Sequence, residues 1–122
     1  MASDNEGTFT IDLIGETTGE RQTGKFKAKL KLSHRDTITK DNIRRNLLGT
    51  DPDKAGGRAQ SLAFIVSELN VRIIDSPSWF KESDFGLELA DDSILAEIYK
   101  KATELEKAEF DRLHKKAEEA IP

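Results

Sequence analysis

The chain has 122 residues, no cysteine and a formal net charge of −4; 34% of its residues are charged and 36% are hydrophobic. This length suits one domain with its own core, and the lack of cysteine excludes disulfides and thiolate metal sites. The opening residues, MASDNEGTF, have neither the basic nor the apolar region of a signal peptide, and no apolar run reaches the length of a membrane span. We therefore expect a soluble intracellular protein.

Charge is unevenly distributed along the chain. Residues 1–20 carry five acidic side chains and no basic one, and residues 21–58 carry eleven basic against four acidic side chains. Residues 59–122 are acidic again, with fourteen acidic against eight basic side chains. A polarised chain of this kind suits docking between surfaces of unlike charge.

A β-hairpin is predicted at 8–32, after a flexible arm at 1–7. Apolar and polar residues alternate over 8–14 and over 25–32, which is typical of half-buried strands. If the turn is centred on Thr18 and Gly19, Phe9 lies opposite Ala28 and Ile11 lies opposite Phe26, so that the two apolar faces coincide.

Three helices are predicted to pack against the apolar face of the hairpin. Ser33 and Thr39 are two possible starts for the first, which we place at about 39–48 because Gly49 suits a C-terminal stop. The second is expected at 58–72. The third, at 92–119 after Asp91 or Asp92, would span about 40 Å at 1.5 Å per residue, so its C-terminal half is expected to project or to contact another chain. The sequence thus predicts a single α+β domain over 8–120.

The segment between the last two helices concentrates aromatic residues. Trp79 and Phe80 follow Pro77, and Phe85 comes soon after. Such residues usually belong to a core, but adjacent aromatics after a proline do not easily both face inward. One of the three is therefore a candidate anchor for a partner protein.

No catalytic or metal-binding pattern is present. His34 and His114 are the only histidines and lie in no ligand spacing, and helix capping explains Asp91 and Asp92 more simply than a paired-carboxylate site. No phosphate-binding or nucleophile motif occurs. We therefore predict a protein that is not an enzyme and needs no cofactor or metal.

Two surfaces are candidates for partner binding. The first is basic and consists of Lys25, Lys27, Lys29 and Lys31 on one strand face, with Arg44 and Arg45 on the following helix. These side chains suit an acidic protein surface or phosphate groups, or they simply form a solvated strand face that discourages aggregation. The second is the stripe of Leu105, Phe110, Leu113 and Ala117 on the last helix.

Six short motifs follow one another along the chain: Gly24-Lys25-Phe26-Lys27-x-Lys29, Leu32-Ser33-x-x-Asp36, Arg44-Arg45-x-Leu47-Leu48-Gly49, Glu68-Leu69-x-Val71-Arg72-Ile73, Pro77-x-Trp79-Phe80 and Gly86-Leu87-x-Leu89-x-Asp91. In this order, over about residues 8 to 105, the chain resembles small proteins encoded in the morphogenesis modules of tailed bacteriophages. These motifs are patterns of fold.

The resemblance implies a non-enzymatic binding role. The favoured expectation is a virion accessory protein that binds an assembled capsid or tail in multiple copies. The alternative is a tail assembly chaperone that binds tape measure or tail tube protein and is absent from the mature virion. A small nucleic-acid-binding regulator is disfavoured, because the chain as a whole is acidic. The protein would then be located in the virion or in the host cytoplasm.

Overall fold

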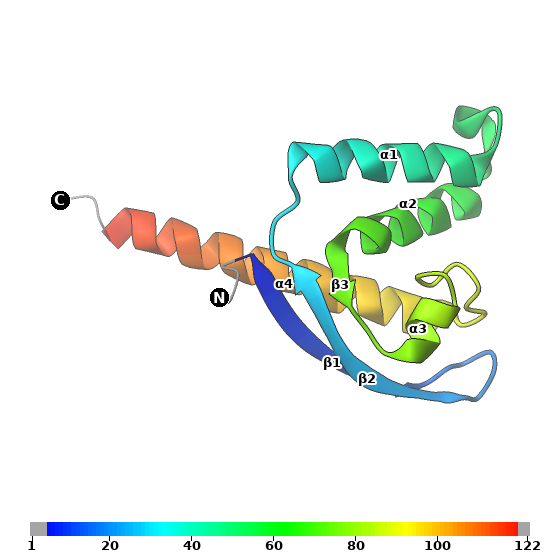
Figure 1. Cartoon of the computed structure of the whole chain (residues 1–122), viewed down its shortest axis with the longest axis horizontal. Helices are drawn as coiled ribbons and strands as arrows, with labels where there is room; N and C mark the ends of the chain where they lie inside the picture. Colours follow the sequence, from blue (N-terminus) through cyan, green and yellow to red (C-terminus); the bar gives the residue numbers. More distant parts are fainter. Residues whose placement is uncertain (1–4, 120–122) are drawn as a thin grey trace.

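The computed structural model describes residues 5–119 and has the predicted α+β fold (Figure 1). Three strands form one antiparallel sheet in the order β1-β2-β3, with bounds Glu6–Ile14, Arg21–Lys29 and Ile73–Asp75. The helices are α1 (His34–Leu48), α2 (Gly57–Arg72), α3 (Ser78–Glu82) and α4 (Asp92–Glu119), with a 3₁₀ turn, η1, at Pro52–Lys54.

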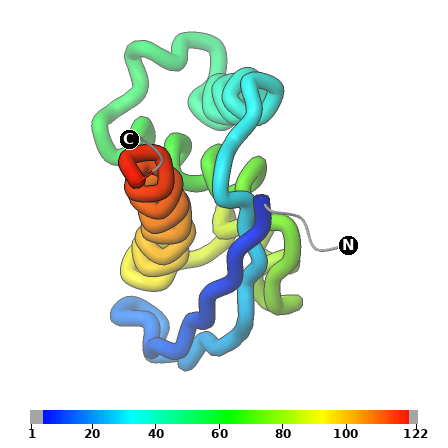
Figure 2. The backbone as a smooth tube through the Cα atoms, turned by 90° about the vertical axis from the view of Figure 1, so that its left-hand side faces the viewer, coloured from blue at the N-terminus to red at the C-terminus, as the bar shows by residue number. Residues whose placement is uncertain are grey.

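The helices are layered on one side of the hairpin. Figures 1 and 2 show α4 running alongside the hairpin, with α2 between α4 and α1. Contacts join α4 to β1, α2 to α4 and α1 to α2. No residue of α1 is buried, so this helix is an outer layer that rests on α2.

The core lies where the hairpin, α2, α3 and α4 meet. Alternation places the apolar side chains of both hairpin strands on its inner face, where they meet the apolar stripes of the helices. The most deeply buried apolar residues are Ile11, Phe26, Ala28, Leu69, Phe80, Ile94, Ile98 and Ala102.

The hairpin register differs from the prediction by two residues. Phe9 lies opposite Phe26, with their rings stacked 5.0 Å apart, and Ile11 lies opposite Gly24. The turn is tighter than predicted, because the Gly15 amide bonds the Glu20 carbonyl at 2.9 Å. A shift of two residues keeps each side chain on its own face, so the apolar faces still coincide.

The strands also begin earlier than predicted. The second strand starts at Arg21 and ends at Lys29, whereas alternation alone suggested 25–32. The first strand starts at Glu6, so Glu6 and Gly7 belong to the sheet and not to an arm. Residues 1–4 of the predicted arm, and residue 120 at the end of the predicted domain, lie outside the described residues.

The first helix begins at His34, so the predicted start near 39 is wrong. Ser33 is the N-cap: its hydroxyl accepts a hydrogen bond from the Asp36 amide at 3.1 Å, and the Asp36 carboxylate accepts one from the Ser33 amide at 3.0 Å. This reciprocal capping box satisfies two of the amides that a helix start leaves free. Thr39 therefore lies inside the helix.

The remaining long helices lie where the sequence placed them, and two short elements were missed. The helix α2 begins one residue before the predicted start, and α4 has the predicted bounds. The missed strand β3 pairs with β2 and has only three residues, too few for a period-two pattern. The missed helix α3 is a five-residue turn directly after Pro77.

Candidate protein-protein interfaces

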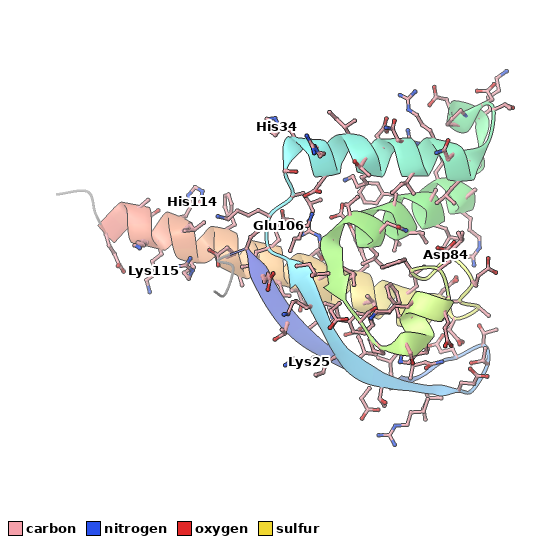
Figure 3. All side chains as sticks on the ribbon, viewed as in Figure 1. Lys25, His34, Asp84, Glu106, His114 and Lys115 are labelled. Carbon is pink, nitrogen blue, oxygen red and sulfur yellow. The ribbon has the colours of Figure 1, made fainter. Side chains whose placement is uncertain are left out.

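Two of the four lysines of the predicted lysine face form ion pairs within the chain. Lys27 pairs with Glu6 at 3.6 Å, and Lys29 pairs with Asp36 at 2.9 Å. Among residues 5–119, neither Lys25, labelled in Figure 3, nor Lys31 makes a direct ion pair. The four lysines therefore do not present four unpaired charges to an acidic surface or to phosphate groups.

The structure does not join Arg44 and Arg45 to the lysine face. Both arginines lie on α1 and share Asp41, at N–O distances of 3.3 Å and 2.9 Å. Arg44 also donates to the side chain of Gln60 on α2. Figure 1 shows this part of α1 on the opposite side of α2 from the sheet, so no continuous basic surface forms.

The aromatic residues of the 76–85 segment form an internal cluster. Phe80 is fully buried and meets Phe26 edge to face, with ring centres 5.2 Å apart. Trp79 is half-buried, and its indole N–H donates to the Thr23 carbonyl at 2.8 Å. Phe85 is half-buried against Phe80. None of the three is an exposed anchor; they attach α3 to the inner face of the hairpin.

Asp91 fixes the hairpin turn. Its carboxylate accepts hydrogen bonds from the amides of Thr17 and Thr18, at 2.6 Å and 3.0 Å, and from the Thr18 hydroxyl at 2.7 Å. These bonds, led by the one from the Thr18 hydroxyl, lower the pKa of Asp91. Asp92 instead pairs with Arg58 at 2.7 Å, so the two carboxylates act separately and not as an acid–base pair.

A buried ion cluster, which the sequence reasoning missed, joins three helices and the sheet. The Arg72 side chain is 2% exposed; it bonds the Glu68 carboxylate at 2.8 Å, the Lys29 carbonyl at 2.9 Å and the Glu106 carboxylate at 3.1 Å. Lys40 of α1 completes the cluster by bonding Glu68 at 3.0 Å. In the sequence, this cluster could have been suspected from Glu68 and Arg72, which lie four residues apart on a helix that faces the core.

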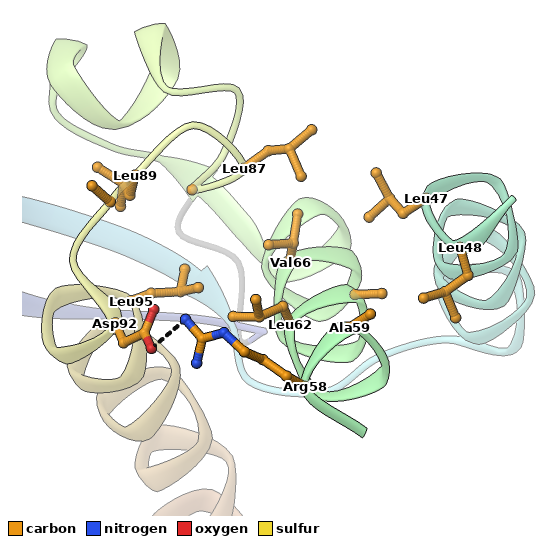
Figure 4. A pocket seen from close by; sticks show the side chains of 13 residues that line it. Leu47, Leu48, Arg58, Ala59, Leu62, Val66, Leu87, Leu89, Asp92 and Leu95 are labelled. Atoms are coloured by element: carbon orange, nitrogen blue, oxygen red, sulfur yellow. Dashed lines mark ion pairs between the residues drawn. The ribbon is translucent and has the colours of Figure 1, made fainter. Parts of the chain in front are cut away.

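An open apolar pocket of about 320 Å³ lies between α2, the end of α1, the segment before α4 and the start of α4 (Figure 4). Its lining includes Leu48, Leu62 and Leu95, and the Arg58–Asp92 ion pair borders it. The charged residues of the lining, Arg58 and Asp92, pair with each other, and the other lining residues are leucine, alanine, valine and one glycine, which is typical of a gap between packed helices.

The end of α4 has the clearest exposed apolar stripe. We call residues 107–119 the distal segment; it extends past the hairpin and past α2 (Figure 1). Phe110 is 58% exposed and Leu113 is 36% exposed. The only ring contact recorded for Phe110 in the described part of the chain is with His114 on the same helix, at 4.0 Å. Leu105, by contrast, packs on the core.

Other kinds of site were sought across residues 5–119. No group of three or more histidine, aspartate or glutamate side chains there is arranged to hold a metal ion. No helix in this range is long and apolar enough to cross a membrane. The fold and its surfaces thus define a small α+β protein with a projecting amphipathic helix end. No family model, curated protein or solved structure shows a significant match to the chain.

Proposed function

We propose that this protein is a non-enzymatic component of a multi-protein assembly and that it binds its partner through the distal segment of α4. One observation carries the proposal: Phe110 and Leu113 are exposed on a helix end that extends beyond the rest of the fold. Burial of side chains of this size contributes about 1.5–3 kcal/mol each, which a partner would provide.

Helix stability supports the same conclusion. The thirteen residues of the distal segment have no buried side chain. They continue a helix whose first part packs on the core, but they lack the apolar burial that gives most protein helices their stability. Tertiary contacts normally stabilise a helix, but beyond Glu109, whose side chain is 13% exposed, the segment extends past the chain's own sheet and helices (Figure 1). A partner lying on Phe110 and Leu113 would supply the missing burial.

The resemblance to phage morphogenesis proteins gives the setting of the proposal. In that setting the protein is a virion accessory component bound to a capsid or tail. The internal neutralisation of Lys27 and Lys29 makes the lysine face a weaker candidate for this contact than the distal segment. The same neutralisation disfavours a nucleic-acid-binding regulator, since phosphate contacts need free cations.

Copy number tests the proposal. Quantitative mass spectrometry is applied to purified particles, and to the lysate, of the phage whose genome encodes this chain. Many copies in mature particles support a virion component. Presence in the lysate together with absence from particles supports the alternative, a tail assembly chaperone.

A surface variant tests the contact itself. Phe110→Glu combined with Leu113→Glu should reduce particle incorporation, or particle yield for a chaperone, at least tenfold. Ile38→Glu is the matched control, because Ile38 is 64% exposed on α1 and equally apolar. Unchanged incorporation and yield in the double variant would show that the distal segment is not the contact.

A further inference from the structure

The two edges of the sheet differ in length and regularity. At one edge, β3 has only three residues, its pairing with β2 shifts register between Lys27 and Ala28, and Pro77 follows soon after. At the other edge, β1 pairs with β2 over nine residues, from Glu6 to Ile14, without a shift. Strands typically have about five or six residues, so β1 offers a long and regular outer edge.

Two hydrogen bonds show which backbone groups of β1 point to this edge. The Gly15 amide bonds the Glu20 carbonyl at 2.9 Å. The Leu30 amide bonds the Asn5 carbonyl at 2.9 Å, and both bonds continue the register of the hairpin. In an antiparallel pair, residues that bond the partner strand alternate with residues whose amide and carbonyl point away from it. The odd-numbered residues of β1 therefore bond β2. The even-numbered residues, whose backbone groups point outward, are Glu6, Thr8, Thr10, Asp12 and Ile14.

These outward backbone groups are available to a partner. Within residues 5–119, no turn, loop or side-chain hydrogen bond reaches the amide or the carbonyl of any of them. All of these residues are exposed, and Ile14 is 63% exposed. Figures 1 and 2 show α4 on the inner side of the hairpin and no described helix or strand along the outer edge of β1. The edge therefore has the donors and acceptors that a further strand needs.

The strand β1 also lacks the features by which proteins usually protect an edge strand. Protected edge strands are commonly short, or they carry lysine, proline, a bulge or an inward-pointing charge. No lysine or proline occurs in β1, and its register is unbroken. The residues that face inward from it, none of them charged, are Gly7, Phe9, Ile11 and Leu13. The edge of β1 is therefore open to strand addition.

The core is incompletely covered at the same edge. Ile11, in the middle of β1, is 1% exposed, but Phe9 and Leu13 on the same face are only half-buried. Neighbouring strands lie about 4.8 Å apart, so inward side chains of an added strand would lie beside Phe9 and Leu13 and cover them further. Apolar side chains suit these positions, because cross-strand apolar pairs stabilise a sheet.

The outer face of β1 is acidic. Glu6 and Asp12 are its charged side chains, and residues 1–20 contain no basic one. Lys27 and Arg21 of β2 approach them from one side, at 3.6 Å and 2.8 Å, and an added strand would approach them from the other. A second copy of β1 would bring only further acidic side chains to this edge. Lysine or arginine on the strand of a different protein would instead pair with Glu6 and Asp12.

We propose that the outer edge of β1 receives an extended segment of a partner protein, which becomes the fourth, antiparallel strand of the sheet. Main-chain hydrogen bonds to the outward residues of β1 hold this segment. Its apolar side chains face inward beside Phe9 and Leu13, and its basic side chains face outward beside Glu6 and Asp12. This surface is separate from the distal segment, so the inference goes beyond the proposed function and does not depend on it.

A synthetic peptide tests the proposal. The test peptide is labelled with fluorescein and alternates valine with lysine or threonine along the length of β1, and fluorescence anisotropy measures its binding to the full chain. In an antiparallel strand the amides of the lysine and threonine residues face β1, so N-methylation of these residues should weaken binding about tenfold or more. N-methylation of the valines, whose amides point away, is the matched control and should leave affinity within about threefold.

Three results of this measurement would overturn the proposal. Strand addition fails if the unmethylated peptide does not bind at millimolar concentration, or if the two methylated peptides bind equally well. Weakening by methylation of the valines alone would mean a parallel strand and would overturn the antiparallel orientation.

Amide hydrogen exchange, followed by NMR for each residue, tests the edge itself. In the chain alone the amides of Thr8, Thr10 and Asp12 should exchange rapidly, whereas β2 should protect those of Phe9 and Ile11. Saturating test peptide should slow exchange of the first three about tenfold or more. Protection of these three in the dilute chain alone would mean that the edge is already covered. Protection that appears as the chain is concentrated would identify a second copy as the occupant, and either result overturns the proposal.

Thr10→Pro blocks the edge from the side of the protein. The Thr10 amide points outward, so proline there removes no bond to β2, and edge strands tolerate proline at such positions. Peptide affinity should fall about tenfold, while protection of Phe9 and Ile11 should show that the hairpin is intact. Thr10→Val keeps the amide and is the matched control, with affinity within about twofold of wild type. Unchanged affinity in Thr10→Pro with an intact hairpin would overturn the site.

A peptide with glutamate in place of lysine tests the charge. It should bind roughly fivefold more weakly at low salt, and equal affinity would overturn the basic character proposed for the segment. Phe110→Glu with Leu113→Glu changes only the distal segment and should leave peptide affinity unchanged. The particle measurements and the peptide measurements therefore decide the two proposals separately.

Discussion

Two adjacent aspartates, Asp91 and Asp92, look equivalent in the sequence but have different structural roles. Asp91 and Asp92 are neighbours, yet the first is 4% exposed and holds the hairpin turn, while the second is exposed and pairs with Arg58. Asp91 reaches the turn across 74 positions of sequence to Thr17. The position of the hairpin turn in the folded chain therefore decides which of the two carboxylates it bonds.

Asp91→Asn should reduce stability at neutral pH and flatten its decline in acid. Hydrogen bonds lower the pKa of Asp91 in the folded state, so its stabilising effect is present above the unfolded pKa and is lost as pH falls through the lower folded value. The asparagine variant should therefore lose less stability than wild type between about pH 5 and pH 2. Urea unfolding at several pH values measures this.

Asp92→Asn is the control for that experiment. Its carboxylate is 57% exposed, so screening by solvent leaves little stability to lose. Parallel pH profiles for wild type and Asp91→Asn would show that the Thr17 and Thr18 bonds do not stabilise the charged form.

Arg72→Met should be among the most destabilising single changes in the chain. It leaves the buried Glu68 carboxylate without its closest partner and the Lys29 carbonyl without its donor, at a cost of about 3–5 kcal/mol. Chemical denaturation measures the free energy of unfolding. Arg21→Ala, which breaks the exposed ion pair with Asp12, should change it little. Equal losses of unfolding free energy in the two variants would show that burial of the Arg72 ion pair does not increase its importance for stability.

At the scale of elements, the local stability of α1 is expected to depend on its helix caps and ion pairs more than on apolar burial. It has no buried residue, and its contacts with the rest of the chain are mainly to α2 and through the ion pairs of Lys40 and Asp36. Local stability follows buried apolar contact, so α1 is expected to open more readily than α2 or α4. The capping box at Ser33 is then a large part of what holds its first turn.

Ser33→Ala should raise amide hydrogen exchange in the first turns of α1 and leave α2 unchanged. Loss of an N-cap hydroxyl costs about 1 kcal/mol, which is roughly a fivefold rise in exchange for amides that open with this helix. Thr39→Ala is the matched control: Thr39 is exposed inside the helix and caps nothing, so exchange should not rise. Faster exchange in the control alone would put the helix start at 39.

At the scale of the whole molecule, the fold and the proposed contact are separable. Every buried residue of α4 lies at or before Ala102, Leu105 packs on the core, and Glu106 reaches Arg72. The distal segment follows these contacts. The proposed contact of α4 therefore lies on a part of the chain that the core does not use.

A chain ending at Ala108 should fold cooperatively with a melting temperature close to that of wild type. It keeps Leu105, which packs on the core, and Glu106, which bonds Arg72. Differential scanning calorimetry measures the melting temperature of both chains. Loss of the cooperative transition in the shortened chain would mean that the distal segment is part of the fold.

Local patterns in the sequence determined the element types. Strict alternation around Phe26 specified a strand, and helical spacing with caps specified α2 and α4, because these periods depend only on neighbouring residues. The apolar face of the hairpin was also predictable, since a register error of two residues does not change it. The exposed character of Phe110 and Leu113 followed from a helix longer than the domain needs.

Only the tertiary structure decided the features that depend on distant residues. Asp91 holds the hairpin turn from a distant part of the chain, and Lys27 and Lys29 pair with Glu6 and Asp36, which lie on other elements. The burial of Arg72 follows from α4 bringing Glu106 alongside it. Hydrogen bonds and ion pairs act over a few ångströms in space, whatever the separation in sequence, so such partners emerge only once the chain is folded.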